Sequence, residues 1–97
     1  MQNIRLLAAA ATVLVLAGTA DAADAPPGAT SCTGCHPATR ADTPVPRLNG
    51  RDAAQTVAAM TEFRTGKRPA TVMDRIAKGF TEDETKAIAA WFAAQKD

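Results

Sequence analysis

Both cysteines and the single histidine of this 97-residue chain lie within five consecutive positions, Cys32-Thr33-Gly34-Cys35-His36. This clustering restricts what the chain can build. A structural zinc site needs four ligands, and these three residues cannot supply them. A thioredoxin-type C-x-x-C belongs to a frame of alternating strands and helices, and the sequence has no strand pattern. A disulfide across so short a gap would close a tiny loop and stabilise little.

The remaining interpretation of these five residues is the motif C-x-x-C-H, whose spacing is typical of c-type haem attachment. Two thiols three positions apart on one helical turn can each add to a vinyl group of the same porphyrin. Gly34 between them leaves room for a flat ring to approach the backbone. The next residue, His36, can offer a neutral imidazole nitrogen to the iron. The motif therefore predicts one covalently attached haem c, held by Cys32 and Cys35, with His36 as an axial ligand of the iron.

The first residues have the pattern of a secretory signal peptide. Arg5 precedes an apolar run from Leu6 to Ala17, and Ala20-Asp21-Ala22 supplies a small-x-small cleavage site. We expect cleavage after Ala22, which makes residues 1–22 a signal peptide and sends the chain to the periplasm with no membrane span left after cleavage. A retained membrane anchor is the alternative, although the run is too short to span a bilayer.

Residues 23–97 are expected to form one monohaem domain. A chain below about 80 residues buries a marginal core and usually needs a covalent or cofactor staple. Since both cysteines are committed, the haem must be that staple, and we expect the chain without haem to be largely unfolded. The net charge of +1 gives no indication of nucleic acid as a partner.

The pattern predicts an all-α chain without strands or internal repeats. Asp52 is a suitable N-cap and Gly66 a suitable helix end. Thr81 and Glu84 have the spacing of a capping box, and two pairs, Ile88 with Phe92 and Ala87 with Trp91, predict one apolar face on the last helix. The predicted helices are Ala29–His36, Asp52–Arg64, Asp74–Lys78 and Thr81–Gln95, and the predicted loops are Pro37–Gly50 and Pro69–Met73.

A second axial ligand must come from methionine, because no other histidine exists. Met60 has core spacing in the middle of a predicted helix, and methionine in that setting usually fills a gap. Met73 follows Pro69 in a predicted loop, which can bring a thioether to the far face of a haem. We therefore expect His36 and Met73 as the two axial ligands. Such a site transfers one electron and leaves no position for substrate.

Taken together, the C-x-x-C-H motif, the segment Pro46-Arg47-Leu48-Asn49-Gly50, a downstream methionine and a capped last helix resemble class I cytochrome c. The resemblance implies the small class I cytochrome c fold, with three to four short helices wrapped round one covalently bound haem. It also implies that the carbonyl of Pro46 accepts a hydrogen bond from His36. The family's first helix normally begins earlier, whereas Pro26-Pro27-Gly28 shortens it here.

A narrower resemblance rests on Met73-Asp74-Arg75-Ile76-Ala77-Lys78-Gly79-Phe80 and Ala89-Ala90-Trp91-Phe92, which are similar to the cytochrome subunit of flavocytochrome c sulfide dehydrogenase. It implies a haem subunit that takes electrons from a flavoprotein dehydrogenase and passes them to a soluble cytochrome or another redox acceptor. The chain would then be no enzyme on its own. A free diffusible carrier between respiratory complexes is the first alternative, and a ligand-binding or peroxidase haem is the second. Basic side chains near Met73 could form a docking rim: Arg64, Lys67, Arg68, Arg75 and Lys78.

Overall fold

The structure is a computed structural model that describes residues 24–39 and 43–96. The predicted signal peptide, residues 1–22, lies outside the described residues. Within the described part, all regular structure is helical and no strand occurs, so the all-α prediction is confirmed. No helix in these two ranges has both the length and the apolar character needed to cross a lipid bilayer.

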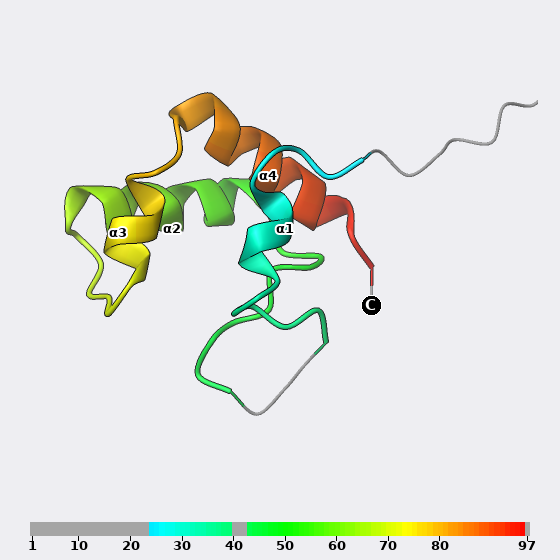
Figure 1. Cartoon of the computed structure of the whole chain (residues 1–97), viewed down its shortest axis with the longest axis horizontal. Helices are drawn as coiled ribbons and strands as arrows, with labels where there is room; N and C mark the ends of the chain where they lie inside the picture. Colours follow the sequence, from blue (N-terminus) through cyan, green and yellow to red (C-terminus); the bar gives the residue numbers. More distant parts are fainter. Residues whose placement is uncertain (1–23, 40–42, 97) are drawn as a thin grey trace, which may run out of the picture.

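Four helices make up this described part: α1 (Ala29–Cys32), α2 (Ala53–Thr65), α3 (Met73–Ala77) and α4 (Glu82–Ala94). The two long helices, α2 and α4, pack against each other. The short helix α3 lies against α2, and α1 contacts α4 (Figure 1). The arrangement leaves α1, α3 and the loop before α2 on the same side of the α2–α4 pair, where the functional site is found.

Local sequence signals fix both ends of α2. The side chain of Asp52 accepts a hydrogen bond from the backbone N–H of Gln55 at 3.0 Å, which satisfies a donor that the first turn would leave free. Gly66 ends the helix with φ at +77°, a conformation that glycine adopts without steric cost. The predicted helix Asp52–Arg64 is therefore confirmed to within one residue.

The capping box of α4 is formed in both directions. The hydroxyl of Thr81 accepts a hydrogen bond from the backbone N–H of Glu84 at 3.1 Å, and the N–H of Thr81 donates to the Glu84 carboxylate at 2.9 Å. These contacts lower the pKa of Glu84, the backbone hydrogen bond from Thr81 first and its side-chain hydrogen bond second. The prediction of a helix between Thr81 and Gln95 is confirmed.

The helix that carries the cysteines is shorter than predicted. It ends at Cys32 rather than His36, and a tight turn follows in which Cys35 N–H donates to the carbonyl of Cys32. Side-chain hydroxyls compete with backbone N–H groups for the carbonyl oxygens of this segment. The Ser31 hydroxyl donates to the Gly28 carbonyl at 2.6 Å, and the Thr33 hydroxyl donates to the Thr30 carbonyl at 2.6 Å. The His36 N–H still bonds to the Cys32 carbonyl at 2.9 Å, so the segment keeps one helix-like turn without continuing as a helix.

The core of the described part of the chain is small, because four of its six buried apolar residues are alanine. Only Ile88 and Phe92 are larger, and both lie on α4. The apolar face predicted for α4 is partly wrong. The buried residues of α4 are Thr85, Ile88, Ala89 and Phe92, whereas Ala87 is exposed. Within residues 24–39 and 43–96, the buried apolar residues are Ala29, Ala59, Ala77, Ile88, Ala89 and Phe92.

The short first helix still covers the last one. Ala29 in α1 is fully buried against Ile88 and Phe92, and Phe92 is only 2% exposed. Trp91 is half-buried and meets Phe92 edge-on, with ring centroids 4.9 Å apart. The glycine and prolines before α1 therefore do not leave Phe92 uncovered.

Candidate functional site

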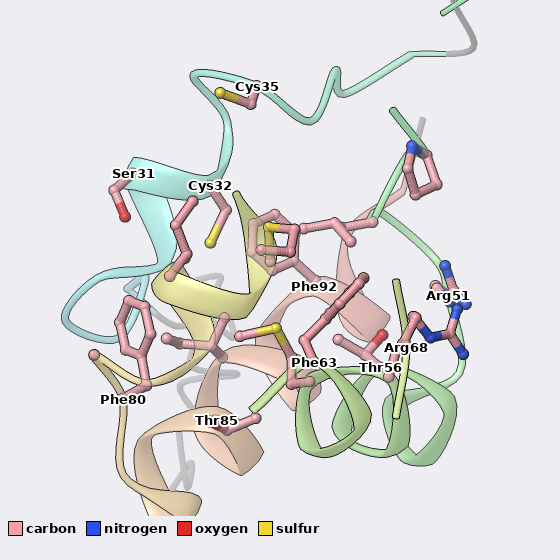
Figure 2. Close-up of a pocket in the computed structure, with 18 of the residues that line it drawn as sticks. Ser31, Cys32, Cys35, Arg51, Thr56, Phe63, Arg68, Phe80, Thr85 and Phe92 are labelled. Atoms are coloured by element: carbon pink, nitrogen blue, oxygen red, sulfur yellow. The ribbon is translucent and has the colours of Figure 1, made fainter. Parts of the chain in front are cut away.

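A cavity of about 500 Å³ opens between the four helices and the loop before α2 (Figure 2). Its volume falls within the range of about 300–1,000 Å³ that small-molecule and cofactor sites occupy. Most of its walls are apolar. The residues that line it are Ser31, Cys32, Cys35, Pro46, Leu48, Arg51, Thr56, Ala59, Met60, Phe63, Arg68, Met73, Arg75, Ile76, Gly79, Phe80, Thr85, Ile88 and Phe92.

Both cysteines of the motif line this cavity as free thiols. Cys32 is the last residue of α1 and is half-buried, and Cys35 lies in the following turn and is exposed. Burial raises the pKa of the Cys32 thiol, partly offset by its hydrogen bonds. That thiol lies 3.8 Å from the carbonyl oxygen of Gly28. Two thiols are thus presented to one apolar space from adjacent turns.

The histidine of the motif has one ring nitrogen held by the backbone. His36 Nδ1 lies 2.6 Å from the carbonyl oxygen of Pro46. Because a carbonyl oxygen only accepts, Nδ1 must carry the hydrogen in this contact, which leaves Nε2 as the nitrogen with a free lone pair. This is the hydrogen bond that the resemblance implies. His36 itself is not among the residues that line the cavity, whereas Pro46 is.

The loop that carries Pro46 is fastened to the end of α4. The N–H of Gly50 donates to the carbonyl of Phe92 at 2.9 Å, and φ of +71° at this position requires glycine. Leu48 packs against the buried cluster around Phe92. Of the two larger apolar side chains beside Pro46 in this loop, Val45 and Leu48, Leu48 lines the cavity.

Two methionines reach the cavity. Met73 was predicted in a loop, but it is the first residue of α3, and Val72 before it is the N-cap, with φ of −141°, ψ of −28° and no side-chain capping hydrogen bond. Met60 was predicted as ordinary core, but it is half-buried and lines the cavity from the middle of α2. Sequence periodicity alone could not separate a core position from a cavity wall, because both are apolar and face inward.

Three arginines line the same cavity: Arg51, Arg68 and Arg75. Arg68 pairs with Glu62 at 2.8 Å and lies over the Phe63 ring, 5.5 Å from its centroid. Arg68 and Arg75 belong to the predicted docking rim, whereas Arg51 is not among the residues that the sequence predicts for the site. The signal available for Arg51 was its place directly after Gly50, at the junction between the loop and α2.

The donor set fits a large apolar prosthetic group attached through thiols. Within residues 24–39 and 43–96, no group of three or more His, Cys, Asp and Glu side chains lies close enough together to hold a metal ion. The two thiols instead face apolar walls from α2, α3 and α4. A flat ring with vinyl groups matches this combination, and the lining methionines add thioethers that suit iron.

Comparisons with known proteins find two relatives. The chain is 36% identical over 63 residues to the cytochrome subunit of sulfide dehydrogenase from Chlorobaculum tepidum, covering 64% of this chain and 57% of that protein. It is 33% identical over 106 aligned positions to the thiosulfate dehydrogenase electron acceptor from Stutzerimonas stutzeri, covering 97% of this chain and 49% of that protein.

The chain thus spans about half the length of the curated relatives it matches. No protein-family model matches the sequence. No solved structure matches it either. One relative is named as the cytochrome subunit of a dehydrogenase and the other as the electron acceptor of a dehydrogenase, and at these modest identities they support a likeness to cytochrome c-like electron-transfer proteins.

Proposed function

We propose that the chain is a periplasmic c-type cytochrome of class I that carries one electron at a time, as the haem subunit of a flavoprotein dehydrogenase acting on sulfide. The premise is its similarity to two cytochrome-like electron carriers. Residues 1–22 would be the cleaved signal peptide and residues 23–97 the monohaem domain. The chain would perform no bond chemistry of its own.

The observation that carries the proposal is that Cys32, Cys35 and Met73 line one apolar cavity of about 500 Å³. Two thiols at C-x-x-C-H spacing, a histidine immediately after them and a thioether across the same space are the groups that a c-type haem requires. A haem bound there would fill the cavity that a chain with so small a core leaves between its helices.

Each residue has a distinct part in this proposal. Cys32 and Cys35 would hold one haem covalently, and His36 would offer Nε2 to the iron while Pro46 fixes the ring through Nδ1. Met73 would supply the second axial ligand. When bound, the haem supplies a one-electron couple, and a histidine–methionine pair favours the ferrous state and raises the potential.

The partner is inferred from the relatives. One is named as a subunit of sulfide dehydrogenase and the other as the electron acceptor of thiosulfate dehydrogenase. We infer a flavoprotein subunit as donor and a soluble cytochrome or another redox acceptor downstream. The second relative's name makes a thiosulfate-oxidising donor the specific alternative. A free diffusible carrier remains the alternative for the chain's mode of action.

Periplasmic expression in a host with a c-type maturation system tests the haem assignment. We expect haem to stay with the chain after acid–organic extraction. In Cys32→Ser and Cys35→Ser variants the attachment should be weakened or lost. Extractable haem in the wild-type protein would refute covalent attachment.

Gentle purification of the protein from its native source tests the partner. Haem and flavin in one complex that reduces its haem on addition of sulfide would support the dehydrogenase subunit. Reduction by thiosulfate instead would identify the alternative donor. A lone haem protein of this chain's size would favour the diffusible carrier.

A further inference from the structure

The connection between α2 and α3, residues 66–72, is tied to the last turns of α2 by Arg68. Its side chain pairs with the Glu62 carboxylate at 2.8 Å and lies over the Phe63 ring, 5.5 Å from the ring centroid. The backbone N–H groups of Lys67 and Arg68 both donate to the Glu62 carbonyl, at 2.9 and 3.2 Å. Arg68 thus holds the start of the connection through its backbone and through its side chain.

The rest of the connection has less local support. Residues 69–71 are exposed, and Val72 is 49% exposed. Val72 is the N-cap of α3 and makes no side-chain capping hydrogen bond. Among the described residues of the connection, Arg68 is therefore the last before Met73 that has a hydrogen bond or ion pair to α2.

The first turn of α3 also contains an unfavourable group. Oδ1 of Asp74, the residue after Met73, is buried and has no hydrogen-bond partner within residues 24–39 and 43–96. A buried oxygen without a partner has lost its hydration, and a turn that opens to solvent recovers it. The other end of α3 is held in the core, because Ala77 is only 1% exposed. The start of α3 is thus the end that can move away, and Arg68 opposes that movement.

We propose that Arg68, through its pair with Glu62, is a positioning residue that keeps Met73 at the haem iron. The inference rests on the proposed function, because it takes Met73 as the second axial ligand. Arg68 and Met73 line the same cavity (Figure 2). The Glu62–Arg68 pair limits how far residues 66–72 can move from α2. When the pair opens, Met73 detaches more often and the sixth position of the iron admits an external ligand.

The size of this effect follows from the exposure of the pair. Both side chains are about two-fifths exposed, so water and salt weaken their attraction. Loss of an exposed pair should raise the population with detached Met73 by about 1.5-fold to fivefold. Higher salt should act on the wild-type protein in the same direction. A variant without the pair should show a weaker salt dependence, because no attraction is left to screen.

Imidazole binding to the ferric holoproteins tests the assignment. External imidazole competes with Met73 for the iron, so its apparent affinity rises with the fraction of molecules in which Met73 is detached. We expect Arg68→Gln and Glu62→Gln each to raise that affinity by about 1.5-fold to fivefold. The double variant should add little to either single change, because both remove the same pair. Arg68→Lys keeps the charge and should restore part of the wild-type behaviour.

The pair between Lys86 and Glu82 on α4 supplies the matched control. It joins two exposed side chains at 3.4 Å, on a helix that carries no proposed iron ligand. Lys86→Gln makes the same charge change and should leave the imidazole affinity unaltered. Equal shifts in Lys86→Gln and Arg68→Gln, or an unchanged affinity in Arg68→Gln, would overturn the inference. If Arg68→Gln accumulates no holoprotein, Glu62→Gln decides alone, since it breaks the same pair and leaves the arginine in place.

The two levels of the proposal fail differently. Wild-type protein without covalent haem would refute the proposed function before any variant is compared. Wild-type protein with covalent haem and an Arg68→Gln variant of unchanged imidazole affinity would leave the function standing and refute only the role of Arg68.

Discussion

Gly28 and Phe80 are packed so closely that a Cβ atom added to Gly28 would lie 2.6 Å from Cε1 of the Phe80 ring. Gly28 is the N-cap of α1 and has φ of +88°. Phe80 follows α3 and lines the cavity. The glycine thus lets the start of the cysteine-bearing helix lie directly on an aromatic wall of the site.

Gly28→Ala should therefore destabilise the protein for two reasons. A non-glycine residue in the left-handed region costs about 1–2 kcal/mol, and an overpacked contact adds about 1–3 kcal/mol. Gly66→Ala is the matched control, because Gly66 also has positive φ, at +77°, but nothing lies within 4 Å of an added Cβ. Denaturant unfolding should show a larger loss for Gly28→Ala. Equal losses would mean that the Phe80 contact contributes nothing.

The two methionines of the cavity can be separated by absorption spectroscopy. Met73→Ala should abolish the weak sulfur-to-iron band near the red end of the ferric spectrum, because it removes the proposed ligand. Met60→Ala should leave that band in place and lower the unfolding free energy by about 2 kcal/mol or more through lost packing. A band that survives Met73→Ala and disappears in Met60→Ala would transfer the ligand to α2.

The capping box of α4 should respond to acid. Hydrogen bonds from Thr81 lower the pKa of Glu84 below its usual value of 4.5, so the folded state favours the ionised carboxylate. Its stabilising effect is therefore present above about pH 4.5 and is lost as pH falls through the lowered pKa of the folded state. The difference in unfolding midpoint between wild type and Glu84→Gln should therefore be present at pH 7. It should shrink as the pH falls below about 4.5.

Asp83→Asn is the control for that experiment, because it removes a charge from the same first turn without touching the capping box. Its effect reports the helix dipole alone. Thr81→Ala removes the other half of the box and should cost about 0.5–2 kcal/mol. A Glu84→Gln difference that stays constant from pH 7 to pH 3 would show that ionisation of Glu84 does not matter.

Phe92 should be the most costly side chain to truncate. Among the described residues it is the most completely buried of the large side chains, at 2% exposure, and α1, the loop and α4 all meet at it. Phe92→Ala should cost about 3–5 kcal/mol, a large share of the stability of a small domain. Ile88→Val, in the same cluster, should cost only about 0.5–1.5 kcal/mol. Urea unfolding of the holoprotein, followed by Trp91 fluorescence, would measure both.

The sequence was most informative where local signals decide structure. Asp52, Gly66 and the Thr81–Glu84 pair fixed α2 and α4 to within a residue, because capping depends on neighbours in the chain. It was less informative at His36, where competing hydroxyl contacts shortened α1. Ala87 was expected in the buried face of α4, yet the neighbouring helices bury Thr85 and Ala89 instead. Which face is buried depends on partners that one helix does not specify.

The residues of the candidate site also differ in whether the sequence alone could predict them. Spacing alone selects Cys32, Cys35 and His36 as candidates, and Met73 is a candidate because it follows Pro69 in a predicted loop. Arg51 could not be predicted, because an arginine after a loop is ordinarily a solvated surface residue. Only the folded arrangement places it at the wall of an apolar cavity, on the side opposite the thiols.

The alanine-rich core has a consequence for the protein's lifetime in the cell. Many of the larger apolar side chains of the described residues line the cavity, so a chain that has not acquired haem would leave them exposed to water and open frequently. Proteases cleave such chains in proportion to the population of the open form. On the proposed function, exported chains without haem would be degraded while loaded chains persist. The steady-state amount of the protein would then follow the supply of haem as closely as the rate of its own synthesis.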